Sequence, residues 1–351
     1  MTKHETMTPK ERWLAVLRRE TPDRTPMDYW GTPEATQKIM AYLGVDDFWQ
    51  MCEKLHIDAP VPVHPLYIGP NIKNGYDYYG RGYQRVDYGT GAYDEVVDHP
   101  LADFSFIGEL EANYNWPSPD WFDFSVIPGQ IKQKEQYPIR GGGSEPFYNY
   151  TMLRGQEQAY LDMVERPEFL QYCLEKIVDF DYEFTRRIFE QIPGQVIYTY
   201  VAEDLGSQEN LLFSPNSIRK FFFPGMRRMI QLAQDAGVFV FTHSDGAIRK
   251  IIPDLIEIGT NILNPIQWRC KGMEREDLKR DFGNDLILHG GVDNQQTLAF
   301  GTVDDVRQEV MDNLEILGKG GGYILAPCHN IQPVSPPENI VTMYKIGYEY
   351  G

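Results

Sequence analysis

Four of the chain's histidines follow short apolar runs of the sequence: His64, His243, His289 and His329. Asp245 lies two residues after one of them, and Cys328 directly precedes another. Imidazole, carboxylate and thiolate groups are the protein ligands of zinc, so their convergence would form a metal site. The spacing His243-x-Asp245 is a weak motif by itself, because Asp245 could equally cap a following helix.

The other candidate residues share this position, at or just beyond the end of an apolar run. We expect the metal ligands to come from His243, Asp245, His329 and Cys328, with Glu203 as a further candidate. The candidate catalytic carboxylates are Glu203, Asp58 and Asp204. The candidate substrate-binding residues are Trp30, His64, Tyr148, Tyr150, Gln208, Asn264 and Asp293.

Eight short apolar runs alternate with amphipathic stretches along the chain, which predicts strands separated by helices. The predicted strands are 26–30, 57–63, 138–141, 196–201, 238–242, 261–264, 286–289 and 323–326. This alternation favours parallel pairing with right-handed crossovers, and eight such units predict an α/β fold of the (β/α)8 TIM-barrel type. In such a barrel, side chains at the strand ends meet at one rim. A doubly wound open sheet is the alternative, but the first predicted strand is followed by no Gly-x-Gly-x-x-Gly.

A segment at about 67–130 does not follow this repeat. Its first part is rich in Tyr and Gly and alternates like a β-hairpin, and its second part contains Pro117, Pro119, Trp116 and Trp121. We expect an aromatic-rich insertion between strands 2 and 3 of one domain that spans residues 1–351. Such insertions often form lids or partner surfaces.

Composition excludes several classes of protein. With 51 acidic and 33 basic side chains, the net charge of −18 opposes binding to nucleic acid and to anionic membrane surfaces. No apolar run approaches the length of a membrane span. The four cysteines are scattered, which is typical of a reducing compartment, and we expect a cytoplasmic protein.

Several of these motifs together resemble the uroporphyrinogen decarboxylase superfamily over nearly the full chain. The matching stretches are Glu203–Gln208, His243–Gly246, Pro253–Gly259, Asn264–Gln267, Gly290–Asp293, Gly321–Pro327, His329–Gln332 and Pro337–Ile340. The resemblance implies a (β/α)8 barrel, in agreement with the strand count.

The superfamily implies two chemistries. Its true decarboxylases need no cofactor; they hold substrate carboxylates with arginines after strand 1 and use an aspartate at strand 2, which Asp58 matches. Residues 28–37 contain no Arg or Lys, so that cationic clamp is missing. Its corrinoid-dependent methyltransferases hold zinc with His-x-Cys after strand 5 and Cys after strand 8. His243 matches the histidine, whereas Asp245 and His329 stand at the two cysteine positions, with Cys328 one residue earlier.

The resemblance is closer to the methyltransferase branch. We expect a zinc-dependent component of an O-demethylase system that moves a methyl group from a small methoxylated substrate to a corrinoid (cobalamin) on a partner protein. One alternative is a metal-free decarboxylase that uses Asp58. Another is a non-catalytic barrel that binds a tetrapyrrole or a corrinoid protein. The sequence leaves the oligomeric state open, including a homodimer.

Overall fold

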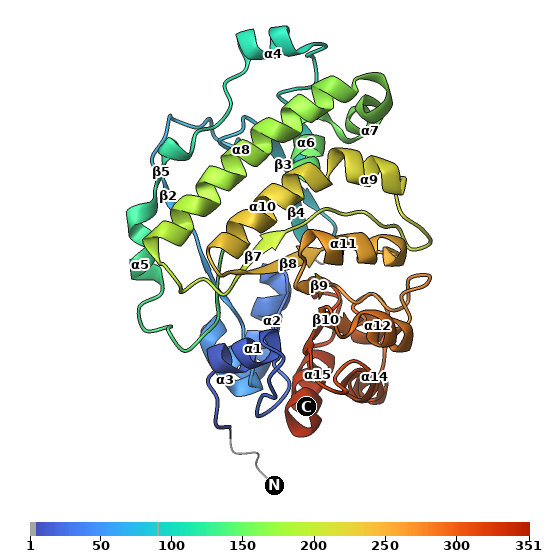
Figure 1. Cartoon of the computed structure of the whole chain (residues 1–351). Helices are drawn as coiled ribbons and strands as arrows, with labels where there is room; N and C mark the ends of the chain where they lie inside the picture. Colours follow the sequence, from blue (N-terminus) through green and yellow to red (C-terminus); the bar gives the residue numbers. More distant parts are fainter. Residues whose placement is uncertain (1–4, 90) are drawn as a thin grey trace.

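The computed structural model describes residues 5–89 and 91–351, and its centre is a curled sheet of seven parallel strands (Figure 1). In spatial order the strands are β1 (Val61–Val63), β6 (Ile139–Ser144), β7 (Tyr198–Val201), β8 (Phe239–His243), β9 (Ile262–Asn264), β10 (Ile287–Val292) and β11 (Tyr323–Pro327). All six neighbouring pairs are parallel. The α/β class predicted from the sequence is confirmed.

The strand predicted at residues 26–30 is not a regular strand. Met27 forms only an isolated parallel bridge with Leu325 of β11. In this bridge Leu325 N donates to Pro26 O, and Asp28 N donates to Leu325 O. On its other side Met27 O accepts from Asp58 N, just before β1. Pro26 lacks an N–H, which limits the ladder that this segment can form. Closure into an eight-stranded barrel stays a prediction.

Helices follow most of the strands and cover the outside of the sheet (Figure 1). The first three are α1 (Pro9–Leu17), α2 (Pro33–Leu43) and α3 (Phe48–Leu55). After β6 come α6 (Pro146–Arg154), α7 (Gln156–Glu165), α8 (Pro167–Gln191), α9 (Pro215–Phe221), α10 (Phe223–Asp235), α11 (Ile252–Ile258), α12 (Arg275–Phe282), α13 (Thr297–Phe300), α14 (Val303–Ile316) and α15 (Pro337–Tyr350). The helix starts follow local chemistry: Thr8 and Glu11 form a capping box on α1, and Pro9 occupies its first turn.

The segment between β1 and β6 holds two small antiparallel sheets and short helices. Its elements are β2 (Leu66–Tyr67), β3 (Gly82–Asp87), β4 (Ala92–Asp98), α4 (Ile107–Asn113), β5 (Phe122–Asp123), α5 (Ile127–Gln130) and the 3₁₀ turns 119–121 and 124–126. β3 pairs with β4 as a hairpin, as the tyrosine-rich alternation predicted. In Figure 1 α4 projects at the end of the molecule away from α1 and α15.

Alternation along the strands decides which side chains face the inside of the curled sheet. In β8, Val240 packs into the core between sheet and helices, whereas Phe241 belongs to a separate inner cluster. The inner cluster also contains Trp13 of α1, Tyr198, Ile262, Ile287 and Ile324. It fills the interior near the strand starts. Two residues further along β8, His243 therefore faces inward above this apolar layer.

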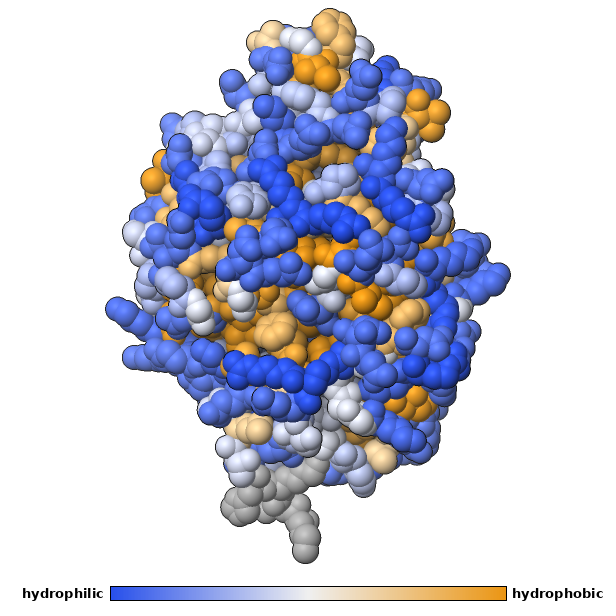
Figure 2. Space-filling view, in the orientation of Figure 1, coloured by the Kyte–Doolittle hydropathy of each residue, from blue (hydrophilic) through white to orange (hydrophobic). Residues whose placement is uncertain are grey.

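The surface is mainly hydrophilic on the face shown in Figure 2, with apolar residues between the polar ones in its middle and near the end where α4 lies. Phe106, just before α4, is 63% exposed. No helix in the described ranges, 5–89 and 91–351, is long and apolar enough to cross a membrane.

Candidate metal centre

His243 ends β8, and two aromatic rings stack on it. The ring of Trp30 stacks on it at a centroid distance of 5.6 Å, and Tyr200 stacks at 5.8 Å. The side chain is buried, with 5% exposed surface. A ring packed in this way has little freedom to turn, so the direction of its two nitrogens is fixed by the fold.

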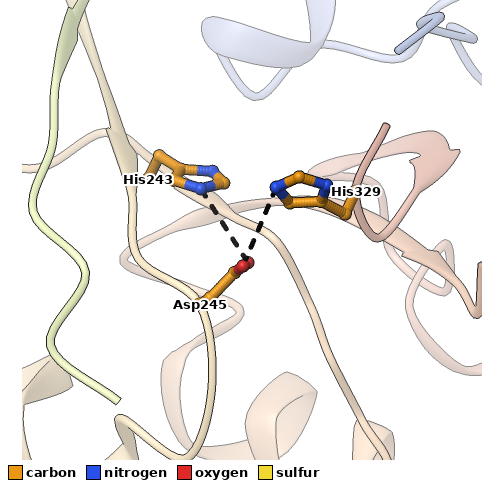
Figure 3. A group of neighbouring side chains, drawn as sticks. All are labelled: His243, Asp245 and His329. Atoms are coloured by element: carbon orange, nitrogen blue, oxygen red, sulfur yellow. Dashed lines mark ion pairs between the residues drawn. The ribbon is translucent and has the colours of Figure 1, made fainter. Parts of the chain in front are cut away.

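Three side chains converge beyond the ends of β8 and β11, as Figure 3 shows: His243, Asp245 and His329. Nε2 of His243 lies 3.8 Å from Oδ1 of Asp245, and Nε2 of His329 lies 3.9 Å from Oδ2 of the same carboxylate. Ligand atoms of a tetrahedral zinc ion with bonds of about 2.1 Å are separated by roughly 3.4 Å. Small side-chain movements would therefore bring the three donors onto one ion.

A series of buried hydrogen bonds fixes the tautomer of a neutral His243 ring. Asp28 accepts hydrogen bonds only, so Nε2 of His289, 3.0 Å from its Oδ2, must donate. A neutral His289 then accepts at Nδ1 from the amide nitrogen of Asn264, 2.8 Å away. The amide oxygen of Asn264 consequently faces His243 and accepts from its Nδ1 at 2.6 Å. The lone pair of His243 is thus on Nε2, the nitrogen that faces Asp245.

The fold also leaves a carboxylate oxygen at this place without a partner. Oδ1 of Asp245 is buried and accepts no hydrogen bond from the described residues. A buried polar atom without a partner is costly, and burial raises the pKa of the Asp245 carboxyl. A cation bound here would contact both this oxygen and the lone pair on Nε2 of His243. The donor set therefore fits a metal ion.

Asp204 is a fourth donor at the edge of the group. Its Oδ1 lies 3.8 Å from Nε2 of His243 and accepts a hydrogen bond from Asp245 N at 3.2 Å. Its side chain is 47% exposed, so it could move toward a bound ion or toward substrate. Of the three carboxylates predicted to be catalytic, Glu203, Asp58 and Asp204, it is Asp204 that lies at the site.

Glu145, between β6 and α6, adds a carboxyl that stays protonated near neutral pH. Burial, and then the negative charge of Asp204, raise its pKa to about 8. The neighbouring Asp181 accepts a hydrogen bond from Ser144 at 2.7 Å, and its pKa is raised to about 7 by burial. A carboxylic acid beside a metal centre can donate a proton to a leaving group.

A cavity of about 730 Å³ lies next to the metal candidates. Trp30 is part of its wall and stacks on His243, and Asn330, also in the wall, follows His329. The cavity extends between the segment at Asp28–Gly31, the start of β1 and Arg140 of β6. Its size suits a small substrate.

Two of the predicted catalytic carboxylates lie apart from this group. Asp58 is fully buried, and its carboxylate pairs with Arg12 at 2.5 Å and Arg24 at 2.8 Å while accepting from Met27 N. Glu203 is also buried and accepts hydrogen bonds from Phe147 N and Tyr148 N, which caps the start of α6. Both carboxylates have structural partners.

Cys328 does not join the metal candidates. Its thiol is buried and donates to the carbonyl of Ile266, and burial raises its pKa well above the ordinary value. A thiol that remains protonated is a poor zinc ligand, because zinc binds the thiolate. The fold therefore selects His329 over its neighbour.

Only some of the predicted substrate-binding residues lie at the site. Trp30 and Asn264 belong to the site, Tyr148 is exposed beside Glu145, and His64 is exposed at the end of β1. Three others make contacts elsewhere: Tyr150 is buried against Asp162, Asp293 pairs with Arg269, and Gln208 contacts Gln295.

Sequence reasoning gave no site role to four residues near the metal candidates or in the cavity wall, namely Asp28, Arg140, Glu145 and His289, although His289 was noted after an apolar run. Asp28 lies in the first predicted strand, and His289 ends the seventh predicted strand, which the structure extends to Val292 as β10, so position alone was a signal for both. Arg140 lies inside a strand, and no local motif distinguishes it. Glu145 comes two residues after Gly143, the last of the glycines at the end of the third predicted strand, and that position was its signal.

Comparison with known proteins gives a family and a solved structure of similar fold. The family model for uroporphyrinogen decarboxylase (URO-D) matches residues 129–350. The chain is 22% identical to a uroporphyrinogen decarboxylase of Pseudoalteromonas translucida (strain TAC 125), over 97% of both chains. It is 23% identical to that of Pseudomonas entomophila (strain L48), over 94% of both. A solved methyltransferase from Methanosarcina mazei has the same fold, with a TM-score of 0.70 and 20% identity over 98% of this chain and 99% of that one.

Proposed function

We propose, from the premise that the chain belongs to the uroporphyrinogen decarboxylase (URO-D) family, that it is a zinc-dependent methyltransferase. It would move the methyl group of a small methoxylated substrate to a corrinoid on a partner protein, as one component of an O-demethylase system. The observation that carries this proposal is the hydrogen bond between Nδ1 of His243 and the Asn264 oxygen, which leaves Nε2 facing the orphaned Oδ1 of Asp245. The likeness of the fold to the Methanosarcina mazei methyltransferase supports it.

His243, Asp245 and His329 would hold the metal, with Asp204 as a further donor. Three protein ligands and an open position are the pattern of catalytic zinc sites. When bound, zinc would supply Lewis acidity that weakens the bond between the methyl carbon and the ether oxygen.

The donor types indicate which substrate atom is activated. Two imidazoles and a carboxylate form a harder set than one with thiolates, and they carry less negative charge. Such a set favours an ether oxygen over a thiol. This is where the site departs from the thiol-activating pattern of the superfamily.

The chain's own groups complete the reaction. The wall formed by Trp30 would orient a flat substrate beside His243. As the carbon–oxygen bond breaks, the methyl carbon passes to the acceptor and the oxygen leaves with the bonding pair. The protonated carboxyl of Glu145 would then give its proton to that oxygen.

The surroundings of Asp58 weigh against the metal-free lyase. A catalytic aspartate must reach the substrate, but this carboxylate is enclosed by two arginines and a backbone N–H. We also propose that the segment at Pro26–Asp28 closes the curled sheet as the first strand of a (β/α)8 barrel, because it hydrogen-bonds to β11 on one side and to Asp58 on the other.

The test is methyl transfer to free cob(I)alamin, followed by the absorbance of the methylated product, with a panel of methoxylated aromatic and aliphatic compounds. We expect the zinc-loaded protein to turn over at least one of them. We expect His329→Ala to lower the rate by a factor of at least about 100. Unchanged transfer by that variant, or by chelator-treated protein, would contradict the proposal.

A further inference from the structure

Arg140 is the second residue of β6 and faces the interior. Its neighbour Ile139 packs in the core between sheet and helices. A Cβ atom on its other neighbour, Gly141, would meet Ile188 of α8 on the same outer side. Since side chains alternate along a strand, Arg140 points to the opposite, inner side, where it forms part of the cavity wall.

The guanidinium of Arg140 has no carboxylate partner. The other buried or half-buried arginines of residues 5–89 and 91–351 each form an ion pair with Asp or Glu. Arg140 forms none, although the chain has an excess of acidic groups. Its charge acts on two neighbouring groups: it lowers the pKa of His64, after the larger effect of desolvation, and opposes the rise that burial causes in the pKa of Tyr198. A half-buried cation without a counter-ion is costly unless a ligand supplies one.

The acidic residue in the wall is bound to other partners. Asp28 also lines the cavity, but its oxygens accept hydrogen bonds from Tyr29 N, Trp30 Nε1 and His289 Nε2. It forms no ion pair with Arg140 among the described residues. The positive charge therefore faces the cavity itself.

Aromatic rings and a second cation complete this end of the cavity. Tyr29, Trp30, Phe48 and Trp49 contribute to the wall. Lys134 also lines it, and its Nζ lies 4.6 Å from the centre of the Trp49 ring. The wall thus combines flat apolar surfaces, on which a ring can stack, with two positive charges that can bind an anion. The carboxylates of Asp204 and Asp245 lie at the metal candidates instead.

We propose that Arg140, supported by Lys134, is a subsite for a carboxylate carried by an aromatic substrate. This inference rests on the proposed function for the identity of the reacting group: the methoxy oxygen would lie toward His243 and the carboxylate toward Arg140. The ring would lie between them, against Trp30. Arg140 acts as a specificity residue that selects acids over neutral compounds of the same shape.

Equilibrium binding by calorimetry tests the subsite without any turnover. The probes are 3,4-dimethoxybenzoate and its neutral counterpart 1,2-dimethoxybenzene, with wild type, Arg140→Met, Arg140→Lys and the exposed-site control Arg18→Met. We expect wild type to bind the acid at least about tenfold more tightly than the neutral compound, as a charge-assisted hydrogen bond would provide. Arg140→Met should remove this preference, Arg140→Lys should keep part of it, and Arg18→Met should keep all of it.

Zinc content and methyl transfer measured on the same samples separate this proposal from the proposed function. Equal binding of acid and neutral compound, including no binding of either, would overturn the subsite. So would an Arg140→Met protein that still prefers the acid. Preference for the acid through Arg140 in a protein that neither holds zinc nor transfers methyl would support the subsite and overturn the proposed function.

Discussion

Nδ1 of His243 lies 2.6 Å from the amide oxygen of Asn264. Because an amide oxygen can only accept, this contact places a proton on Nδ1 and leaves the lone pair on Nε2. Asn264 holds this orientation because its amide nitrogen is bound to His289, which in turn is bound to Asp28. This series of hydrogen bonds begins at Asp28, whose carboxylate can only accept. It ends at His243, whose Nε2 is the nitrogen that would bind a metal.

Asn264→Leu should therefore weaken zinc binding although Asn264 is not a ligand. Leucine has a similar size but cannot accept the Nδ1 proton, so the ring loses both its orientation and its tautomer. We expect the dissociation constant for zinc to rise by about 10- to 100-fold. Competition with a chromogenic chelator measures it.

The matched control for Asn264→Leu is Thr242→Val. Thr242 is buried beside His243 in β8, and its hydroxyl contacts Thr260 away from the site. This variant should lose stability but keep wild-type zinc affinity. Equal zinc affinities of Asn264→Leu and Thr242→Val would show that this series of hydrogen bonds does not position His243.

Cys328→Ala should retain zinc and methyl transfer. The thiol is buried, points to the carbonyl of Ile266 and has a raised pKa, so it is not available as a ligand. The expected cost is about 1 kcal/mol of folding free energy from the lost packing and the unpaired carbonyl. Zinc analysis and urea unfolding measure the two effects, and loss of zinc from this variant would assign the third ligand to Cys328.

Asp58→Asn tests the lyase alternative. Removing one partner of a buried ion pair leaves an uncompensated charge and costs about 3–5 kcal/mol. We expect a lower urea midpoint, because Arg12 and Arg24 remain buried, and a rate constant for methyl transfer near wild type in the folded fraction. Unchanged stability together with abolished turnover would instead assign Asp58 a catalytic role.

Glu145→Gln should change the pH dependence of stability in chelator-treated protein. Burial raises the pKa of Glu145 to about 8. The folded state therefore binds the proton more tightly than the unfolded state, whose pKa is near 4.5. The contribution of Glu145 to the free energy of unfolding is complete below about pH 4.5 and is lost as the pH rises through about 8.

Glutamine stays neutral, so the variant does not lose this contribution. We expect the variant to match wild type near pH 5 and to be more stable than wild type above pH 8. Thermal unfolding at both pH values measures the difference. A variant less stable than wild type at high pH would show that the folded protein favours the charged carboxylate.

The alternation of strands and helices could be predicted from the sequence because it depends on local periodicity. The hairpin at β3 and β4 followed from the same kind of pattern. The segment at Pro26–Trp30 is not the regular strand that was predicted. Its pairing is set by β11 on one side and Asp58 on the other, and the proline at its start limits the ladder of hydrogen bonds.

The residues of the site were only partly predictable. His243, Asp245 and His329 were selected because they follow strands, and the structure brings them together. Glu203 and Asp58 follow or begin strands as well, but their partners, the start of α6 and the arginines of the N-terminal region, come from elsewhere in the chain. Arg140 is unpaired because the fold brings none of the described acidic side chains into an ion pair with it. A local sequence pattern does not contain that information.

Zinc content after exhaustive dialysis tests the central claim most directly. Wild type and His243→Ala, purified in parallel and loaded with zinc, would be compared by elemental analysis, with circular dichroism to confirm that both are folded. The account predicts a stoichiometric amount of zinc in wild type and loss of nearly all of it in His243→Ala. Wild type without zinc, or a folded variant that keeps it, would contradict the account.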